Sequence, residues 1–74
     1  MNNNQQITYM QARLVRLASE EWNMSIQKVV SIFSEWAVLK FIRECFDTFH
    51  VEGDYVILDD IVNYLSNRGV KIDA

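Results

Sequence analysis

The segment at residues 37–50 is apolar around most of the circumference of a helix, and this limits the possible folds more than any other feature of the chain. Its charged side chains recur at the three- and four-residue spacing of one narrow helical face. These side chains are Lys40, Arg43, Glu44 and Asp47. A helix that is apolar on nearly all its other positions is stable in water only when further elements cover it. The sequence therefore predicts a central helix over residues 37–50 with other helices packed around it.

Two earlier segments have the apolar periodicity of amphipathic helices. The first is predicted over residues 8–22, where Thr8 and Gln11 fit a reciprocal capping box. The second begins after Ser25, whose hydroxyl can accept a hydrogen bond from an amide of the first turn. Its predicted apolar stripe consists of Ile26, Val29, Val30 and Phe33.

The C-terminal third contains both glycines of the chain. Gly53 predicts a turn after the central helix, because glycine adopts positive φ at no steric cost. Residues 55–57 fit either a short extended segment or the first turn of a helix, since two of the three are β-branched. The last helix is predicted to end at Arg68. Gly69 can then take the left-handed cap position, and Val70 can fold back onto the last turn.

These segments predict an all-α fold, a compact bundle of about four short helices with the extended segment at 55–57 as an alternative. Residues 7–72 are expected to form a single helical domain, because no linker separates the segments. Residues 1–6 are polar, and a disordered N-terminal tail is expected there. A core of this size rarely supplies more than about 3–5 kcal/mol of net stability without a disulfide or metal, so dense packing or a partner is needed.

The chain offers little for catalysis or metal binding, with one cysteine and one histidine. Cys45 and His50 are five residues apart, so on one helix their side chains point about 140° apart. Cys45 is flanked by phenylalanines and is interpreted as a buried apolar residue. His50 is interpreted as a capping residue, and the acidic residues around Gly53 lack the spacing of a calcium loop. We expect no catalytic residue, no cofactor and no metal, and therefore no enzyme.

The formal net charge is −3, and the basic residues form no stripe. An acidic chain of this kind is not expected to bind nucleic acid. The first six residues lack the charge and apolar run of a secretory signal, and no apolar run approaches the length of about 20 residues that spans a bilayer. We expect a cytoplasmic protein that does not enter a membrane.

Large aromatic residues are numerous for so short a chain. Core packing is one interpretation of them. The other is that some lie exposed as anchors for a partner, because tryptophan and tyrosine dominate binding hot spots and a thin bundle cannot bury all of them. The candidate interface residues are Tyr9, Trp22, Trp36, Tyr55 and Tyr64.

The stretch from Val38 to His50, followed by Gly53 to Leu65, resembles a family of short bacterial proteins designated domain of unknown function 3791. The similarity covers residues 7–68, although Glu35-Trp36 stands where the family pattern has a glycine-type break. The resemblance implies a helix ending in histidine, a glycine turn and an Asp-Ile helix. It implies no activity and no catalytic residues. Some members are encoded near ADP-ribosyltransferase-like proteins, an arrangement similar to a toxin–antitoxin pair.

Small size, acidic charge, aromatic excess and the lack of a catalytic constellation favour a protein-interaction module. It would be an antitoxin-like or adaptor partner of a neighbouring gene product. One alternative is a nucleic-acid-binding regulator that uses the second and third helices as a helix-turn-helix. That role needs a recognition helix with outward-pointing basic or amide side chains. Another is a structural homodimer.

Overall fold

The computed structural model describes residues 2–72, and all regular structure in that range is helical. The helices are α1 (Asn3–Trp22), α2 (Ile26–Glu35), α3 (Val38–Glu44), α4 (Phe46–Phe49) and α5 (Asp54–Ser66). The predicted all-α class is confirmed. The alternative of an extended segment at residues 55–57 is wrong, because these residues form the first turns of α5.

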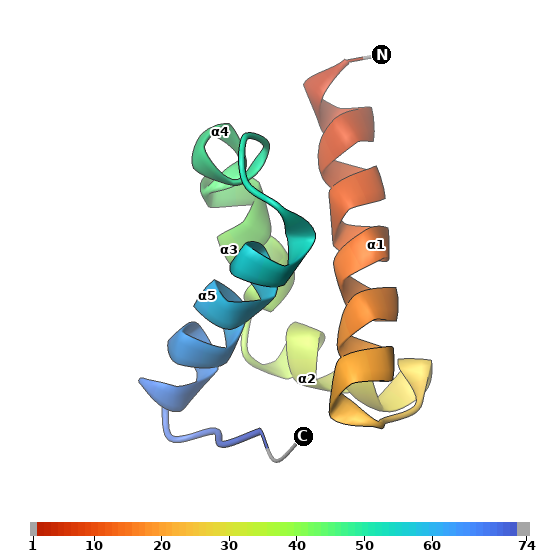
Figure 1. Ribbon diagram of the computed structural model, residues 1–74, viewed down its shortest axis with the longest axis vertical. Coiled ribbons are helices and arrows are strands. Elements are labelled where there is room, and N and C mark those ends of the chain that lie inside the picture. The colour runs from red at the N-terminus through yellow and green to blue at the C-terminus, as the bar shows by residue number, and fades with distance from the viewer. Residues whose placement is uncertain (1, 73–74) are drawn as a thin grey trace.

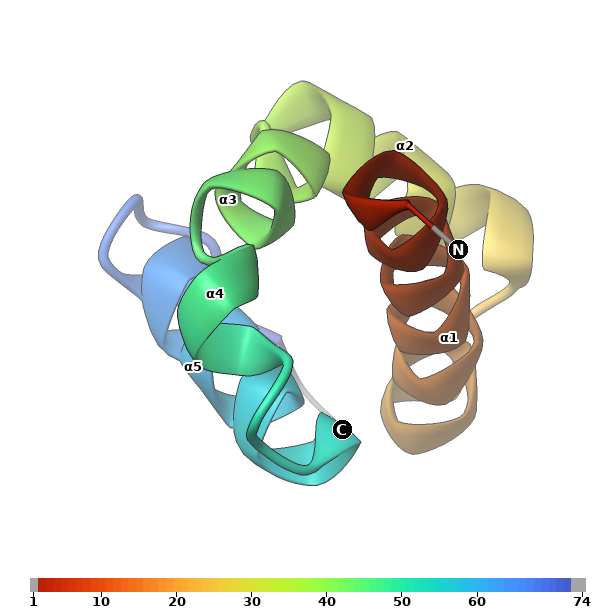
Figure 2. The ribbon, with the colours of Figure 1, turned by 90° about the horizontal axis from the view of Figure 1, so that it is seen from above.

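The helices surround a single core. Figure 1 shows α1 along one side of the molecule and α3, α4 and α5 along the other, with α2 crossing between them at one end. Seen from above, the helices follow one another around the core in chain order (Figure 2). α1 packs against α2, α3 and α5, so the first and last helices meet.

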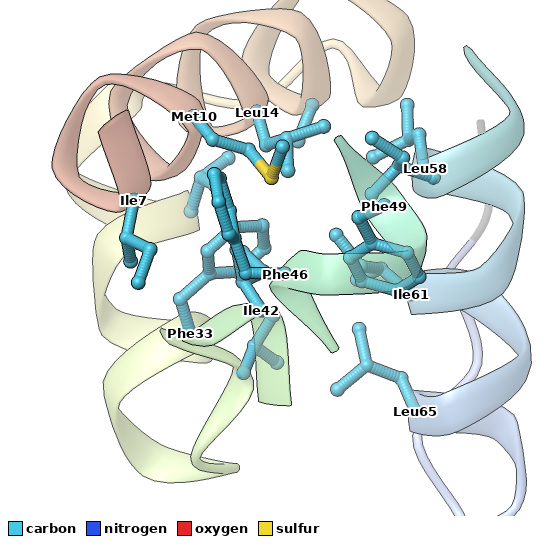
Figure 3. Packing of buried hydrophobic residues seen from close by; sticks show 14 of the residues in the cluster. Ile7, Met10, Leu14, Phe33, Ile42, Phe46, Phe49, Leu58, Ile61 and Leu65 are labelled. Carbon is cyan, nitrogen blue, oxygen red and sulfur yellow. The ribbon is translucent and has the colours of Figure 1, made fainter. Parts of the chain in front are cut away.

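Every helix contributes apolar side chains to this core, and no polar side chain is buried among the described residues. α1 supplies five of them at helical spacing, Ile7, Met10, Leu14, Ala18 and Trp22. Figure 3 shows Phe46 of α4 reaching in toward Met10 of α1, while Leu58 and Ile61 close the core from α5. Burial of each large apolar side chain contributes roughly 1.5–3 kcal/mol relative to exposure. The core therefore depends on side chains from both ends of the chain.

α1 begins at Asn3, five residues before the predicted start at Thr8. Asn2 is its N-cap. The Asn2 side-chain oxygen accepts from the Gln5 amide at 2.9 Å, and the Gln5 side-chain oxygen accepts from the Asn2 amide at 3.3 Å. This is a capping box of the predicted kind at different residues, because Gln11 instead donates its side-chain amide to the carbonyl of Leu39 at 2.9 Å. The expected disordered tail is thus helical from Asn3, and residue 1 lies outside the described residues.

The central helix predicted over residues 37–50 is interrupted. α3 ends at Glu44 and α4 begins at Phe46, with Cys45 between them at φ −97° and ψ 8°. The bend turns the chain toward α5 (Figure 1). The prediction of one helix is wrong because the apolar spacing runs through the bend. Ile42, Phe46 and Phe49 are all buried, so the sequence shows no change of phase there.

The turn between α2 and α3 contains no glycine. Ala37 adopts the left-handed conformation, with φ 56° and ψ 35°, which costs a residue with a Cβ roughly 1–2 kcal/mol. The Tyr64 hydroxyl donates to the carbonyl of Trp36 at 2.8 Å, so α5 holds this turn in place. The predicted N-cap of α2 is confirmed, because the Ser25 hydroxyl accepts from the Lys28 amide at 3.1 Å.

The two glycines have different roles. Gly69 has φ 87°, and the Val70 amide donates to the carbonyl of Leu65 at 2.9 Å, which confirms the predicted left-handed cap. Gly53 has φ −74° and is the N-cap of α5. A turn does precede α5, but the expected positive φ at Gly53 is wrong.

Candidate interaction surface

An apolar groove lies between α1 and α2. The residues that line it are Thr8, Gln11, Ala12, Val15 and Arg16 of α1, Ile26 and Val30 of α2, and Leu39 of α3. The α1 residues follow helical spacing on a face next to the buried stripe of that helix. The groove is therefore a continuous strip of surface made by three helices.

α2 leaves half of its apolar stripe uncovered at this groove. Val29 and Phe33 are fully buried, whereas Ile26 is 48% exposed and Val30 is 42% exposed. The predicted apolar stripe of α2 is therefore divided between the core and the groove. The core covers only one edge of the stripe, and the other edge faces the groove.

Few polar groups of the groove are free to bind a partner. The Gln11 side-chain amide is already bonded to the Leu39 carbonyl. Arg16 is the one charged lining residue. The single ion pair within residues 2–72 joins Arg13 to Asp54 at 3.2 Å, so Arg16 has no acidic partner in that range.

Three of the five candidate interface aromatics have packing roles. Trp22 is only 4% exposed and meets Phe33 edge to face, with ring centroids 6.1 Å apart. The Tyr64 ring stacks on Phe41 at 4.3 Å, and the Arg68 guanidinium lies 3.6 Å from its centroid. Trp36 is partly buried against the core. These three side chains help to hold the bundle together.

The other two aromatics are exposed, Tyr9 by 54% and Tyr55 by 63%. Tyr9 lies one helical turn before Arg13 on α1, and Tyr55 follows Asp54 at the start of α5. They therefore flank the ion pair that joins the two helices. Tyr9 and Tyr55 stay predicted interface residues, separate from the α1–α2 groove.

The remaining candidate groups are occupied locally. His50 has its Nδ1 atom 3.1 Å from the carbonyl oxygen of Phe46, and its ring stacks on the Phe46 ring. Burial raises the pKa of the Cys45 thiol, and the nearby carboxylates of Glu44 and Asp60 raise it further. A raised pKa disfavours the reactive thiolate at neutral pH.

Residues 2–72 contain neither a cluster of metal-binding side chains nor a membrane-spanning helix. No three histidine, cysteine, aspartate or glutamate side chains lie close enough together there to hold a metal ion. No helix in that range combines the length and the apolar composition needed to cross a membrane.

The fold and surface define a class of protein, a small all-α bundle with an exposed apolar groove between its first two helices. The family described as "Protein of unknown function (DUF3791)" matches residues 9–68, and the chain belongs to this family. The resemblance found in the sequence is thereby confirmed. The matched range includes every groove-lining residue except Thr8. No curated protein and no solved structure matches the chain.

Proposed function

We propose that this protein is an interaction module that binds a partner protein through the α1–α2 groove. The observation that carries the proposal is the exposure of Ile26 and Val30 beside the apolar lining residues Ala12 and Val15. Contiguous apolar surface on a small protein marks an interaction site more often than isolated apolar residues do. Covering Ile26 and Val30 would contribute on the order of 1 kcal/mol each, since both are about half exposed.

Within this class we propose an antitoxin-like or adaptor role, with a neighbouring gene product as the partner. A bundle of this size would act by occupying a surface of that partner. Some members of the family that the sequence resembles are encoded near ADP-ribosyltransferase-like proteins. This gene arrangement is similar to that of a toxin–antitoxin pair, and it supports the role. The proposal places the protein in the bacterial cytoplasm.

A nucleic-acid-binding regulator is less well supported. In that alternative α3 would be the recognition helix, yet it has only seven residues. The Arg43 guanidinium donates to the side-chain oxygen of Asn4 at 3.3 Å, which engages one of the two basic residues of α3. Salt-dependent retention on DNA would favour this alternative over the interaction module.

The test compares two matched aspartate variants in affinity capture from the cells that naturally make the protein. Val30→Asp places a charge in the groove. Val56→Asp makes the same change on α5, where Val56 is 51% exposed and does not line the groove. Circular dichroism would first establish that both variants are folded.

We expect the wild type and Val56→Asp to recover one protein in stoichiometric amount, and Val30→Asp to lose it. Recovery of the same protein with Val30→Asp would move the interaction to another surface, such as Tyr9 and Tyr55. Recovery of the chain alone, as a monomer or as a homodimer, would refute the antitoxin-like or adaptor role.

A further inference from the structure

We propose that the occupant of the α1–α2 groove is one amphipathic helix of the partner protein, with acidic residues flanking its apolar stripe. This inference rests on the proposed function and gives the chemistry of the segment that binds. It follows from the dimensions of the groove and from the charges around it.

The dimensions fit about two turns of helix. The α1 wall runs from Thr8 to Arg16, and eight steps at 1.5 Å each give a length of about 12 Å. A groove between two packed helices accepts the side-chain ridge of a third helix. A partner helix would therefore place apolar anchors at i and i+3 or i+4, and a third at i+7.

Charge is segregated along this chain. Residues 2–43, which form α1, α2 and most of α3, contain five basic and three acidic residues, a net charge of +2. Residues 44–72 contain two basic and six acidic residues, a net charge of −4. The groove is built entirely by the positively charged part, although the whole chain is acidic.

The charges nearest the groove are mainly positive. Arg16 lines it, Lys40 follows the lining residue Leu39, and Arg43 lies one turn beyond Leu39. Lys28 lies between the lining residues Ile26 and Val30 along the chain. The acidic residues within four positions of a lining residue are Glu20, after Arg16, and Glu35, before Leu39. Arg13 follows the lining residue Ala12 but is paired with Asp54, which leaves four cations against two carboxylates. This balance, with Arg16 at the lining itself, favours a partner with acidic side chains beside its stripe.

A second copy of the chain fits the groove less well. Two grooves facing each other across a two-fold axis would bring the same cationic edge onto both sides of the interface. Insertion of the acidic α5 surface around Val56 into the groove of another copy would be head-to-tail, a contact that builds rings or open filaments and not the two-fold dimer that is commonest among oligomers.

The test uses three designed, fluorescein-labelled helical peptides that share one leucine stripe at i, i+3, i+4 and i+7. Their flanking positions carry glutamate, glutamine or lysine. Fluorescence anisotropy with the full chain measures the dissociation constant of each. We expect the glutamate peptide to bind about tenfold more tightly than the lysine peptide, and the difference to shrink as salt is raised.

Three variants assign this preference to the groove. Arg16→Glu should narrow or reverse the order of the glutamate and lysine peptides. Val30→Asp should weaken all three by about tenfold or more, since it buries an unpaired carboxylate. Val56→Asp, the matched change outside the groove, should leave all three unchanged.

Equal binding of the three peptides, or preference for the lysine peptide, would overturn the acidic-helix inference. Failure of all three to bind the wild type would overturn it as well. The capture experiment in cells tests the proposed function separately, so a groove-dependent partner without peptide binding would leave the function standing. A homodimer that Val30→Asp dissociates and Val56→Asp does not would replace the partner helix by a second copy.

Discussion

Replacing Ala37 by glycine should stabilise the protein, although glycine usually destabilises helical proteins. Ala37 is held at φ 56° in the turn between α2 and α3. Removing its Cβ relieves roughly 1–2 kcal/mol of steric strain. The added freedom of the unfolded chain offsets about 0.4–1 kcal/mol of that gain. Because the Ala37 side chain is exposed, no packing is lost, and the net gain is about 0.5–1 kcal/mol.

Thermal and urea unfolding followed by circular dichroism measure this gain. A gain of that size raises the Tm of a domain this small by about 2–8 °C. Ala12→Gly is the matched control, because Ala12 is also exposed but lies inside α1, where glycine costs about 0.5–1 kcal/mol. A lower or unchanged Tm for Ala37→Gly, beside the expected fall for Ala12→Gly, would refute the strain argument.

Three further outcomes are expected. Tyr64→Phe should lower the free energy of unfolding by about 0.5–1.5 kcal/mol, since the ring stacking is kept and only the hydrogen bonds of the hydroxyl to the Trp36 and Ala37 carbonyls are lost. An unchanged urea midpoint would contradict this. Asp54→Asn should cost less than about 1 kcal/mol, because its ion pair with Arg13 is partly exposed to solvent. A loss that does not shrink in high salt would speak against an electrostatic origin. Iodoacetamide should alkylate Cys45 more slowly in the folded protein than in urea, because the pKa of the thiol is raised by folding. The raised pKa also makes the stability depend on pH: the stabilisation is complete below the ordinary thiol pKa and is lost as pH rises through the pKa of the folded protein. A free energy of unfolding that increases over that pH range would exclude the raised pKa.

The fold was predictable where one short stretch of sequence determines the structure. Ser25 and Gly69 are local signals, and both cap the predicted helices. The start of α1 was missed because several polar residues in succession each suit an N-cap, and their composition resembles a disordered tail. The bend at Cys45 was missed because the apolar spacing continues through it. The position of a helix start or of a bend among several suitable residues is decided by tertiary contacts, which the local sequence does not show.

The groove could be predicted only in part, because its walls come from three helices. Ile26 and Val30 share a stripe with Val29 and Phe33, and the sequence does not indicate which edge of the stripe the other helices cover. One signal was available. The α2 positions that continue outward from Val30 are Gln27, Ser31 and Ser34, all uncharged, and depletion of charge is typical of the centre of an interface.

The order of the helices around the core has a kinetic consequence. α1, α2 and α3 each pack against the next helix in sequence, and α1 also packs against α3, so much of the core needs only short or moderate loops to close. The contact of α1 with α5 differs, because Arg13 and Asp54 are 41 residues apart. Single helices form within about a microsecond, faster than contacts between distant segments. Docking of α5 onto α1 is therefore expected to set the folding rate, and because loop-closure entropy grows only slowly with length, that rate stays in the microsecond-to-millisecond range of helical bundles.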